Sequence, residues 1–224
     1  MVENLIYREI LTDLATTYPK GSTDRKSDLN HLLSLQGSFC IFSDYRNGTT
    51  TLMKDFARRV NGIFVDSMSL RQGEEIEELE EIVGSEDNPF LLDETVVFFE
   101  RLGGYEKAMD YLQIQSEKRQ VGLRLHNGSN QNRDDLRKRG FEIVEIGKIP
   151  YAEFKAIFDS HFEGTGFSLP ERFVQYGHTT YDLLAESVWY VAEAFRLLIE
   201  NPETELSETK VKESVEKQYM WFKV

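Results

Sequence analysis

A polar loop between an apolar run and a helical pattern has the spacing of a phosphate-binding site. The apolar run is Phe39–Phe42, and the loop begins at Ser43. In phosphate-binding loops a glycine is followed, after four residues, by Gly-Lys-Ser/Thr, and backbone N–H groups surround the phosphates. Gly48 stands at the second glycine, and Thr50 stands at the hydroxyl position that binds Mg²⁺. The spacing therefore predicts an anion site at the start of a helix.

Two positions of this loop depart from the pattern. Ser43 replaces the first glycine, and Thr49 replaces the lysine that would give the outer phosphates a positive charge. Asp44 adds a negative charge, and Arg46 could partly replace the lysine. A polar turn without any ligand is the open alternative. The residues expected to contact a cofactor are Ser43, Arg46, Asn47, Gly48, Thr49, Thr50 and Thr51.

Two acids follow a later apolar run, Phe90-Leu91-Leu92. They are Asp93 and Glu94. In nucleotide hydrolases an acid at this place holds Mg²⁺, and a second acid can polarise the attacking water. We therefore expect Thr50 and Asp93 as metal ligands and Glu94 as the residue that polarises water. The alternative is that Asp93 only caps the next helix.

A third polar position follows the next apolar run, Val121–Leu125. Asn127 stands two residues after it and could contact an outer phosphate or orient water, so we include it with Asp93 and Glu94 as a candidate catalytic residue. Ser129 is the second choice. The pair Asn127-Gly128 can also form a simple turn.

The elements that must position these residues alternate along the chain. Strands are predicted at residues 39–42, 63–66, 89–94, 121–125 and 141–146, the last alternating like an edge strand. Helices are predicted at residues 24–35, 50–60, 73–83, 96–115 and 134–139. Such alternation predicts an α/β fold of the P-loop NTPase type, with a parallel sheet and helices on both faces. The loop and the acids would then meet at the carboxyl ends of the strands.

Only helical patterns follow Pro150. They cover residues 151–162, 170–176, 181–200 and 208–219. We therefore expect a core at residues 1–149, with N-terminal helices inside 3–35, and a small all-helical lid subdomain at 150–224.

The order of these motifs resembles that of AAA+ ATPases of the archaeal ATPase and origin-recognition type. Residues 48–54, Gly-Thr-Thr-Thr-Leu-Met-Lys, are similar to the Gly-Lys-Thr-Thr-Leu-Leu-Lys of that family, and residues 91–94 resemble its Walker B motif. Residues 125–130 resemble its sensor-1 segment, and residues 23–29 resemble its entry motif. Residues 145–154 are similar to its fifth strand and first lid helix, so the resemblance covers about residues 20 to 200.

The chain also departs from that family. The lid arginine called sensor 2 has no counterpart at residues 177–181, where His178 is the available cation. An arginine finger cannot be assigned; the resemblance only suggests Arg133, Arg137 and Arg139 by region. The origin-binding members carry a winged helix, which we do not expect in these 224 residues.

Composition limits the partners. A formal net charge of −13, from 26 basic and 39 acidic residues, makes nucleic acid an unexpected direct ligand, because such binding depends on Lys and Arg contacts. Cys40 is alone, so an internal disulfide is excluded, and His and Cys show no zinc-ligand spacing. The sequence has no signal-peptide pattern and no run of about 18 apolar residues, so we expect a cytoplasmic protein outside the membrane.

The missing lysine and lid arginine decide the predicted function. We expect a degenerate AAA+-like protein that acts as a binding, scaffold or regulatory module, with weak or absent nucleotide hydrolysis and a protein partner or a second copy of itself. ATP and Mg²⁺ are the cofactors that the loop could hold, with none expected otherwise. One alternative is an active, divergent ATPase that uses Thr50, Asp93 and Glu94 with Mg–ATP. The other is a DNA-replication-associated factor.

Overall fold

A computed structural model describes residues 25–44, 47–84, 87–127, 133–201 and 205–219 of the chain. These residues form two compact units. Of the described residues, 25–44 and those within 49–147 belong to the sheet unit, and residues 47–48 and those from Lys148 onward belong to the helical unit. The predicted N-terminal helix before residue 25 and the candidate Ser129 lie outside the described residues.

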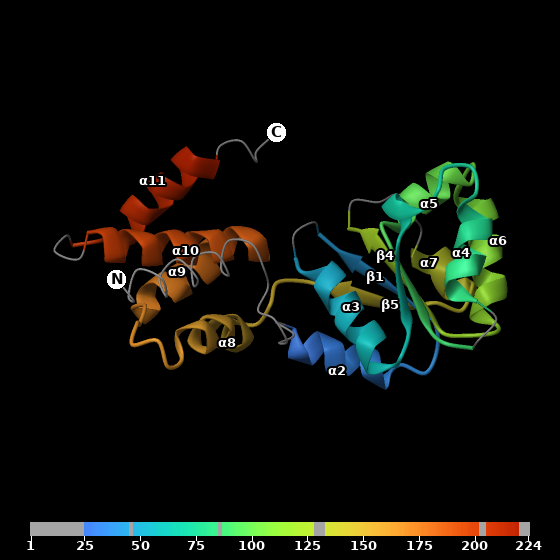
Figure 1. The fold of residues 1–224 in the computed structure, drawn as a ribbon, viewed down its shortest axis with the longest axis horizontal. Helices are drawn as coiled ribbons and strands as arrows, with labels where there is room; N and C mark the ends of the chain where they lie inside the picture. The colour runs from blue at the N-terminus through green and yellow to red at the C-terminus, as the bar shows by residue number, and fades with distance from the viewer. Residues whose placement is uncertain (1–24, 45–46, 85–86, 128–132, 202–204, 220–224) are drawn as a thin grey trace. The chain divides into compact units, whose positions relative to one another are not determined.

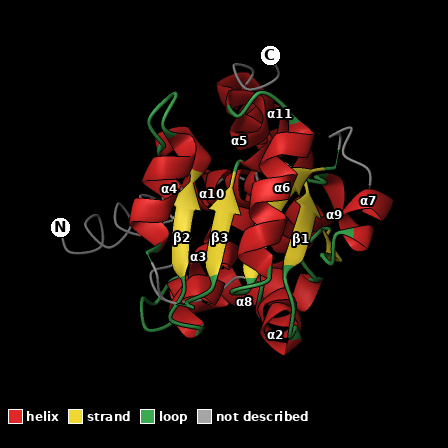
Figure 2. Ribbon diagram, turned by 90° about the vertical axis from the view of Figure 1, so that its right-hand side faces the viewer, coloured by secondary structure: helices red, strands yellow, loops and turns green. Residues whose placement is uncertain are grey.

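The sheet unit is built on five parallel strands. The strands are β1 (Phe39–Ser43), β2 (Ile63–Asp66), β3 (Phe90–Asp93), β4 (Val121–His126) and β5 (Glu142–Ile146). Their order in the sheet is β2-β3-β4-β1-β5, so β5 lies at an edge as predicted. Figure 2 shows the labelled strands pointing the same way. The ends of β1, β3 and β4 therefore meet at one edge of the sheet, where the sequence places its candidate residues.

Helices cover both faces of this sheet, as the sequence predicts. The bounds are α2 (Lys26–Ser34), α3 (Thr49–Arg59), α4 (Glu75–Val83), α5 (Thr95–Arg101), α6 (Tyr105–Ser116), α7 (Arg133–Lys138) and the 3-10 turn η1 (Ser67–Ser69). On one face, Phe39 and Ile41 of β1 pack with side chains of α2 and α3. On the other face, Cys40 and Phe42 pack with side chains of α4, α5, α6 and α7. Two of the covering helices, α4 and α6, stand in front of the strands in Figure 2.

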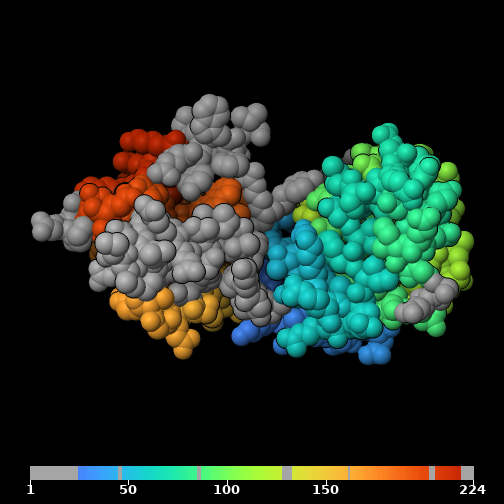
Figure 3. Space-filling view, viewed as in Figure 1, coloured from blue at the N-terminus to red at the C-terminus, as the bar shows by residue number. Residues whose placement is uncertain are grey.

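The three inner strands β1, β3 and β4 are buried beneath these helices. All five residues of β1 and all four of β3 are buried. In the space-filling view, the cyan and green atoms from α3 onward make up most of the visible face of the sheet unit (Figure 3). Burial also raises the pKa of the Cys40 thiol, which packs as a small apolar side chain in the core.

The single helix predicted at residues 96–115 is wrong. The structure has two helices there, because α5 ends at Arg101 and α6 begins at Tyr105. Gly103 and Gly104 between them have φ angles of 83° and 132°. L-residues with side chains rarely adopt such angles, so this glycine pair ends one helix and redirects the chain into the next.

The helical unit contains four described helices, labelled in Figure 1. They are α8 (Tyr151–Phe162), α9 (Glu171–Thr180), α10 (Leu184–Glu200) and α11 (Glu208–Tyr219). Helix α9 is longer than the predicted 170–176. The four helices share one apolar core that includes Phe154, Phe173, Tyr190 and Phe195. Among the described residues, a helix with the length and apolar character needed to cross a membrane is not found.

Candidate functional site

The two predicted metal ligands lie side by side. Helix α3 begins at Thr49, directly after Gly48, whose φ angle is 75°. This places Thr50 in the first turn of α3, while Asp93 is the last residue of strand β3. The Thr50 hydroxyl donates a hydrogen bond of 2.7 Å to Asp93 Oδ2. The spacing of the sequence thus identified two residues that the fold brings into contact.

A third residue, Arg124 of β4, joins this pair and was missed by the sequence analysis. Its Nη1 atom lies 2.9 Å from Asp93 Oδ1, 2.9 Å from Glu94 Oε1 and 3.4 Å from Thr50 Oγ1. The side chains of Arg124 and Asp93 are 5% and 4% exposed, and that of Glu94 is 25% exposed. An arginine side chain stays protonated in proteins. The acids that would hold a metal are therefore already paired with a buried, permanent cation.

The alternation of β4 contains a signal for Arg124. Side chains two residues apart in a strand point to the same face, so Gly122, Arg124 and His126 share one face. A side chain at Gly122 would meet Phe39 and Leu91, which belong to the core beneath α3. A charged residue on that face of a buried strand needs a partner. The acids at the end of the neighbouring strand are the partners, and strand order was needed to see this.

Glu94 is held in an uncommon backbone conformation. Its φ angle is 50° and its ψ angle is 43°, in the left-handed region that non-glycine residues rarely adopt. Its backbone N–H donates to Asp93 Oδ1 at 3.0 Å. Such conformations cluster at functional sites and cost about 1–3 kcal/mol. In this backbone conformation, the Glu94 carboxylate accepts a hydrogen bond from Arg124.

The Glu94 carboxylate also faces His126 at the end of β4. The Nε2 atom of His126 lies 3.5 Å from Glu94 Oε2. Burial lowers the pKa of His126, and the charge of Arg124 lowers it further, while Glu94 acts in the opposite direction. A lowered pKa favours the neutral imidazole at pH 7, so Arg124 remains the cation that neutralises these acids.

The position of the missing lysine is filled by a buried hydroxyl contact. Thr49 is 2% exposed and Ser43 is fully buried. The Thr49 hydroxyl donates a hydrogen bond of 2.8 Å to Ser43 Oγ. These are the two positions at which the sequence departs from the phosphate-loop pattern, and the fold brings them together. The backbone N–H of Asn127 donates to the Ser43 carbonyl at 3.2 Å, while the Asn127 residue is exposed.

The other loop positions are less closely associated with the acids. Arg46, the predicted substitute for the lysine, lies outside the described residues. Asn47 and Gly48 group with the helical unit, and Asn47 Oδ1 accepts a hydrogen bond of 3.1 Å from the Leu184 backbone N–H. Thr51 is partly buried in the first turn of α3.

The side chains considered as sensor or finger residues have partners within their own units. Arg133 lies over the Phe42 ring at 3.9 Å and bonds to Glu145. Arg137 pairs with Asp134. The guanidinium of Arg139 contacts three acids, Glu106, Asp110 and Asp135. In the helical unit, His178 Nε2 lies 2.8 Å from the Ile149 carbonyl oxygen and its ring packs beside Phe154, which gives it a structural contact.

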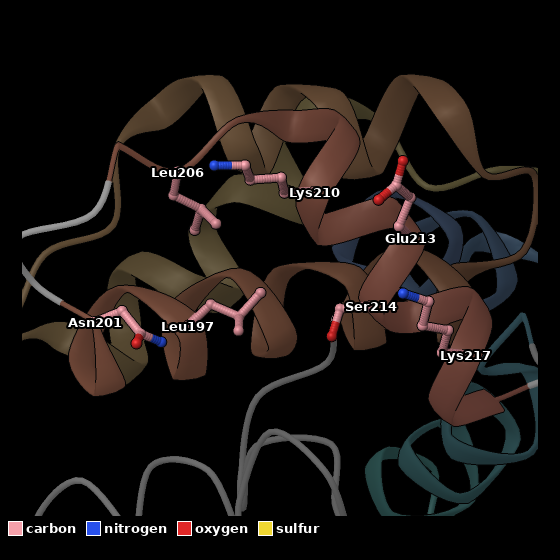
Figure 4. A pocket seen from close by; sticks show the side chains of 7 residues that line it. All are labelled: Leu197, Asn201, Leu206, Lys210, Glu213, Ser214 and Lys217. Atoms are coloured by element: carbon pink, nitrogen blue, oxygen red, sulfur yellow. The ribbon is translucent and has the colours of Figure 1, made fainter.

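The described residues contain no cluster of three or more His, Cys, Asp or Glu side chains that could hold a metal ion. A pocket of about 300 Å³ lies in the helical unit, between α10 and α11. Figure 4 shows its side chains, which include two lysines but none of the candidate site residues. The lining residues are Leu197, Asn201, Leu206, Lys210, Glu213, Ser214 and Lys217.

Solved structures share this architecture at low sequence identity. The Orc1 protein of Aeropyrum pernix, in complex with DNA, aligns with a TM-score of 0.63 and 13% identity, over 95% of this chain and 69% of that one. The chain has the fold of the AAA+ ATPases. RuvB of Thermotoga maritima, a Holliday junction branch migration motor, aligns at 0.56 and 12% identity, over 95% of this chain and 68% of that one.

Domain III of the replication initiation protein DnaA of Thermotoga maritima also aligns. Its TM-score is 0.52 at 12% identity, over 93% of this chain and 89% of that one. No protein-family model and no curated protein matches the sequence. Identities this low support the fold alone, so the activity has to be argued from the residues of the site.

Proposed function

We propose that this protein is a degenerate AAA+-like module that binds a protein partner or a second copy of itself and does not hydrolyse nucleotide. The observation that carries this proposal is Thr49, which stands where the phosphate-binding lysine would stand. Thr49 is 2% exposed, and its hydroxyl donates a hydrogen bond to Ser43 Oγ. The loop therefore lacks a point charge for the outer phosphates at that position, and removing one charged contact to a transferred phosphoryl group typically costs several kcal/mol of transition-state stabilisation.

The pairing of Asp93 and Glu94 is a second reason to expect no nucleotide hydrolysis. In a hydrolase, Asp93 would hold Mg²⁺ and Glu94 would polarise water. Here both carboxylates are paired with Arg124. Thr50 donates its hydroxyl hydrogen to Asp93. The residues as they stand do not fit Mg–ATP, so we derive no hydrolytic step from them.

This fold is also compatible with binding functions that need no nucleotide hydrolysis. The α/β unit and the helical unit each have a buried apolar core and offer surfaces for a partner, and the low identity to the solved structures leaves that partner open. A DNA-replication-associated role is the second candidate, because Orc1 was solved with DNA and DnaA is a replication initiation protein. The acidic balance of this chain makes direct DNA binding the weaker of the two roles.

ATP turnover tests the proposal. The purified chain is expected to release no phosphate above the background rate at millimolar Mg–ATP. The matched variant Asp93→Asn should give the same background, because any trace of activity would then come from a contaminating ATPase. Turnover that disappears in Asp93→Asn would contradict the proposal and support an active, divergent ATPase that uses Thr50, Asp93 and Glu94.

A further inference from the structure

One nitrogen atom of Arg124 lies among three oxygen atoms of the candidate site. Nη1 is 2.9 Å from Asp93 Oδ1, 2.9 Å from Glu94 Oε1 and 3.4 Å from Thr50 Oγ1. Hard divalent cations such as Mg²⁺ prefer sets of carboxylate and hydroxyl oxygens. The set of oxygens is present, but a guanidinium group stands beside every member of it.

Arg124 already neutralises part of the acidic charge of the cluster without a metal. Two carboxylates face one guanidinium, which leaves a single net negative charge. A divalent ion bound to the same oxygens would be placed next to a fixed positive charge, and like charges at such short range repel strongly where water is scarce. A divalent ion and the Arg124 guanidinium therefore compete for the same oxygen atoms.

Burial keeps the arginine in that place. The side chains of Arg124 and Asp93 are 5% and 4% exposed, so neither can reach water without a rearrangement of the core. Breaking a buried pair leaves an uncompensated charge and is strongly unfavourable. Arg124 also lies within β4, opposite Ile41 of β1, so its backbone is held by the centre of the sheet.

We infer that Arg124 is a built-in cation that takes the place of the divalent metal between Thr50, Asp93 and Glu94, and that it excludes Mg²⁺ from this site. This inference rests on the proposed function, since it explains why the site does not use Mg–ATP. It goes beyond that function by assigning a residue to the exclusion of the metal. It also implies that the oxygen atoms of Thr50, Asp93 and Glu94 would bind a divalent metal if the arginine were removed.

The test measures Mn²⁺ binding without nucleotide, so its outcome is separate from ATP turnover. Free Mn²⁺ is followed by electron paramagnetic resonance in the full chain and in four variants, which include Asp93→Asn as a control for binding by the wild-type chain. The wild-type chain and Arg124→Lys, which keeps a cation, should bind no Mn²⁺ at this site. Arg124→Gln should bind one Mn²⁺ per chain, and the double variant Asp93→Asn/Arg124→Gln should lose that ion.

Two results would overturn the inference. The first is one Mn²⁺ bound by the wild-type chain and lost in Asp93→Asn. The second is a folded Arg124→Gln chain that binds none. Mn²⁺ should also stabilise Arg124→Gln, because at about 100 times the dissociation constant a ligand raises the folded-to-unfolded ratio about a hundredfold.

Failure of Arg124→Gln to fold would itself be informative. The inference then requires that Asp93→Asn/Arg124→Gln folds, because the second change removes the buried charge of Asp93 and leaves only the more exposed carboxylate of Glu94. A double variant that also fails to fold would contradict the inference, since Arg124 would then be needed for packing rather than for neutralisation. Background ATP turnover with a metal-binding wild-type chain would refute this inference alone and leave the proposed function standing.

Discussion

At the scale of single residues, two buried contacts distinguish the candidate site: Thr49 bonds to Ser43, and Arg124 pairs with Asp93. The loss of the lysine at Thr49 and the acids at Asp93 and Glu94 can be seen in the sequence. The contact between Thr49 and Ser43 depends on how the loop between them folds, and the pairing of Arg124 with the acids depends on packing between the strands β3 and β4. Arg124 was missed because the sequence alone does not show which acids lie beside an arginine in an apolar run. The order of the strands is needed to identify them.

The hydroxyl of Thr49 should matter for stability. In Thr49→Val the fully buried Ser43 Oγ loses its donor, and an unsatisfied buried group of this kind costs about 1–3 kcal/mol. The free energy of unfolding, measured with urea, should fall by that amount. The control Thr51→Val changes a partly buried position in the same helical turn and should stay within about 0.5 kcal/mol of the wild type. Equal losses in both variants would show that the Ser43 contact has no special role.

At the scale of elements, hydrophobic patterns predict most of the sheet unit. The strand at residues 63–66 has the predicted bounds, and the other four differ by one or two residues. The error at residues 96–115 has a local cause, since the apolar pattern continues across Gly103 and Gly104 although the backbone does not. The extra length of α9 reflects packing of its last turn, where Gly177 lies against Tyr190 and Val191 of α10.

Strand β4 should tolerate no side chain at Gly122. A Cβ atom there would lie 2.8 Å from Phe39 Cζ and 3.2 Å from Leu91 Cγ, both fully buried. Overpacking of this kind typically costs about 1–3 kcal/mol, so Gly122→Ala should lower the free energy of unfolding by that amount. Gly37→Ala is the matched control, because a Cβ atom there has nothing within 4 Å. The packing argument fails if the two variants unfold at the same denaturant concentration.

At the scale of the whole molecule, the net charge of −13 is a stronger argument against DNA as a direct partner than the fold is an argument for it. The fold is shared with Orc1, which was solved with DNA, yet this chain has 13 more acidic than basic residues. The fold is therefore compatible with several roles, and charge is the property that separates them. It could be read from the sequence in full, because it needs no knowledge of packing.

Direct DNA binding should be absent. Fluorescence anisotropy of a labelled 30-base-pair duplex is expected to stay unchanged with micromolar protein at about 50 mM salt, where phosphate contacts are strongest. Binding at this salt concentration that weakens steeply as salt rises would favour the DNA-associated role. A basic control protein titrated into the same duplex establishes that the assay can detect such contacts.

The central claim is that the acids of the candidate site are already paired with Arg124, so that the site does not bind Mg–ATP. Isothermal titration calorimetry of the wild-type chain with Mg–ATP tests it most directly. We predict no saturable heat up to millimolar nucleotide and no shift of the unfolding midpoint, since a ligand at 100 times its dissociation constant would add about 2.7 kcal/mol. Saturable binding of one Mg–ATP per chain that is lost in Asp93→Asn would contradict the account.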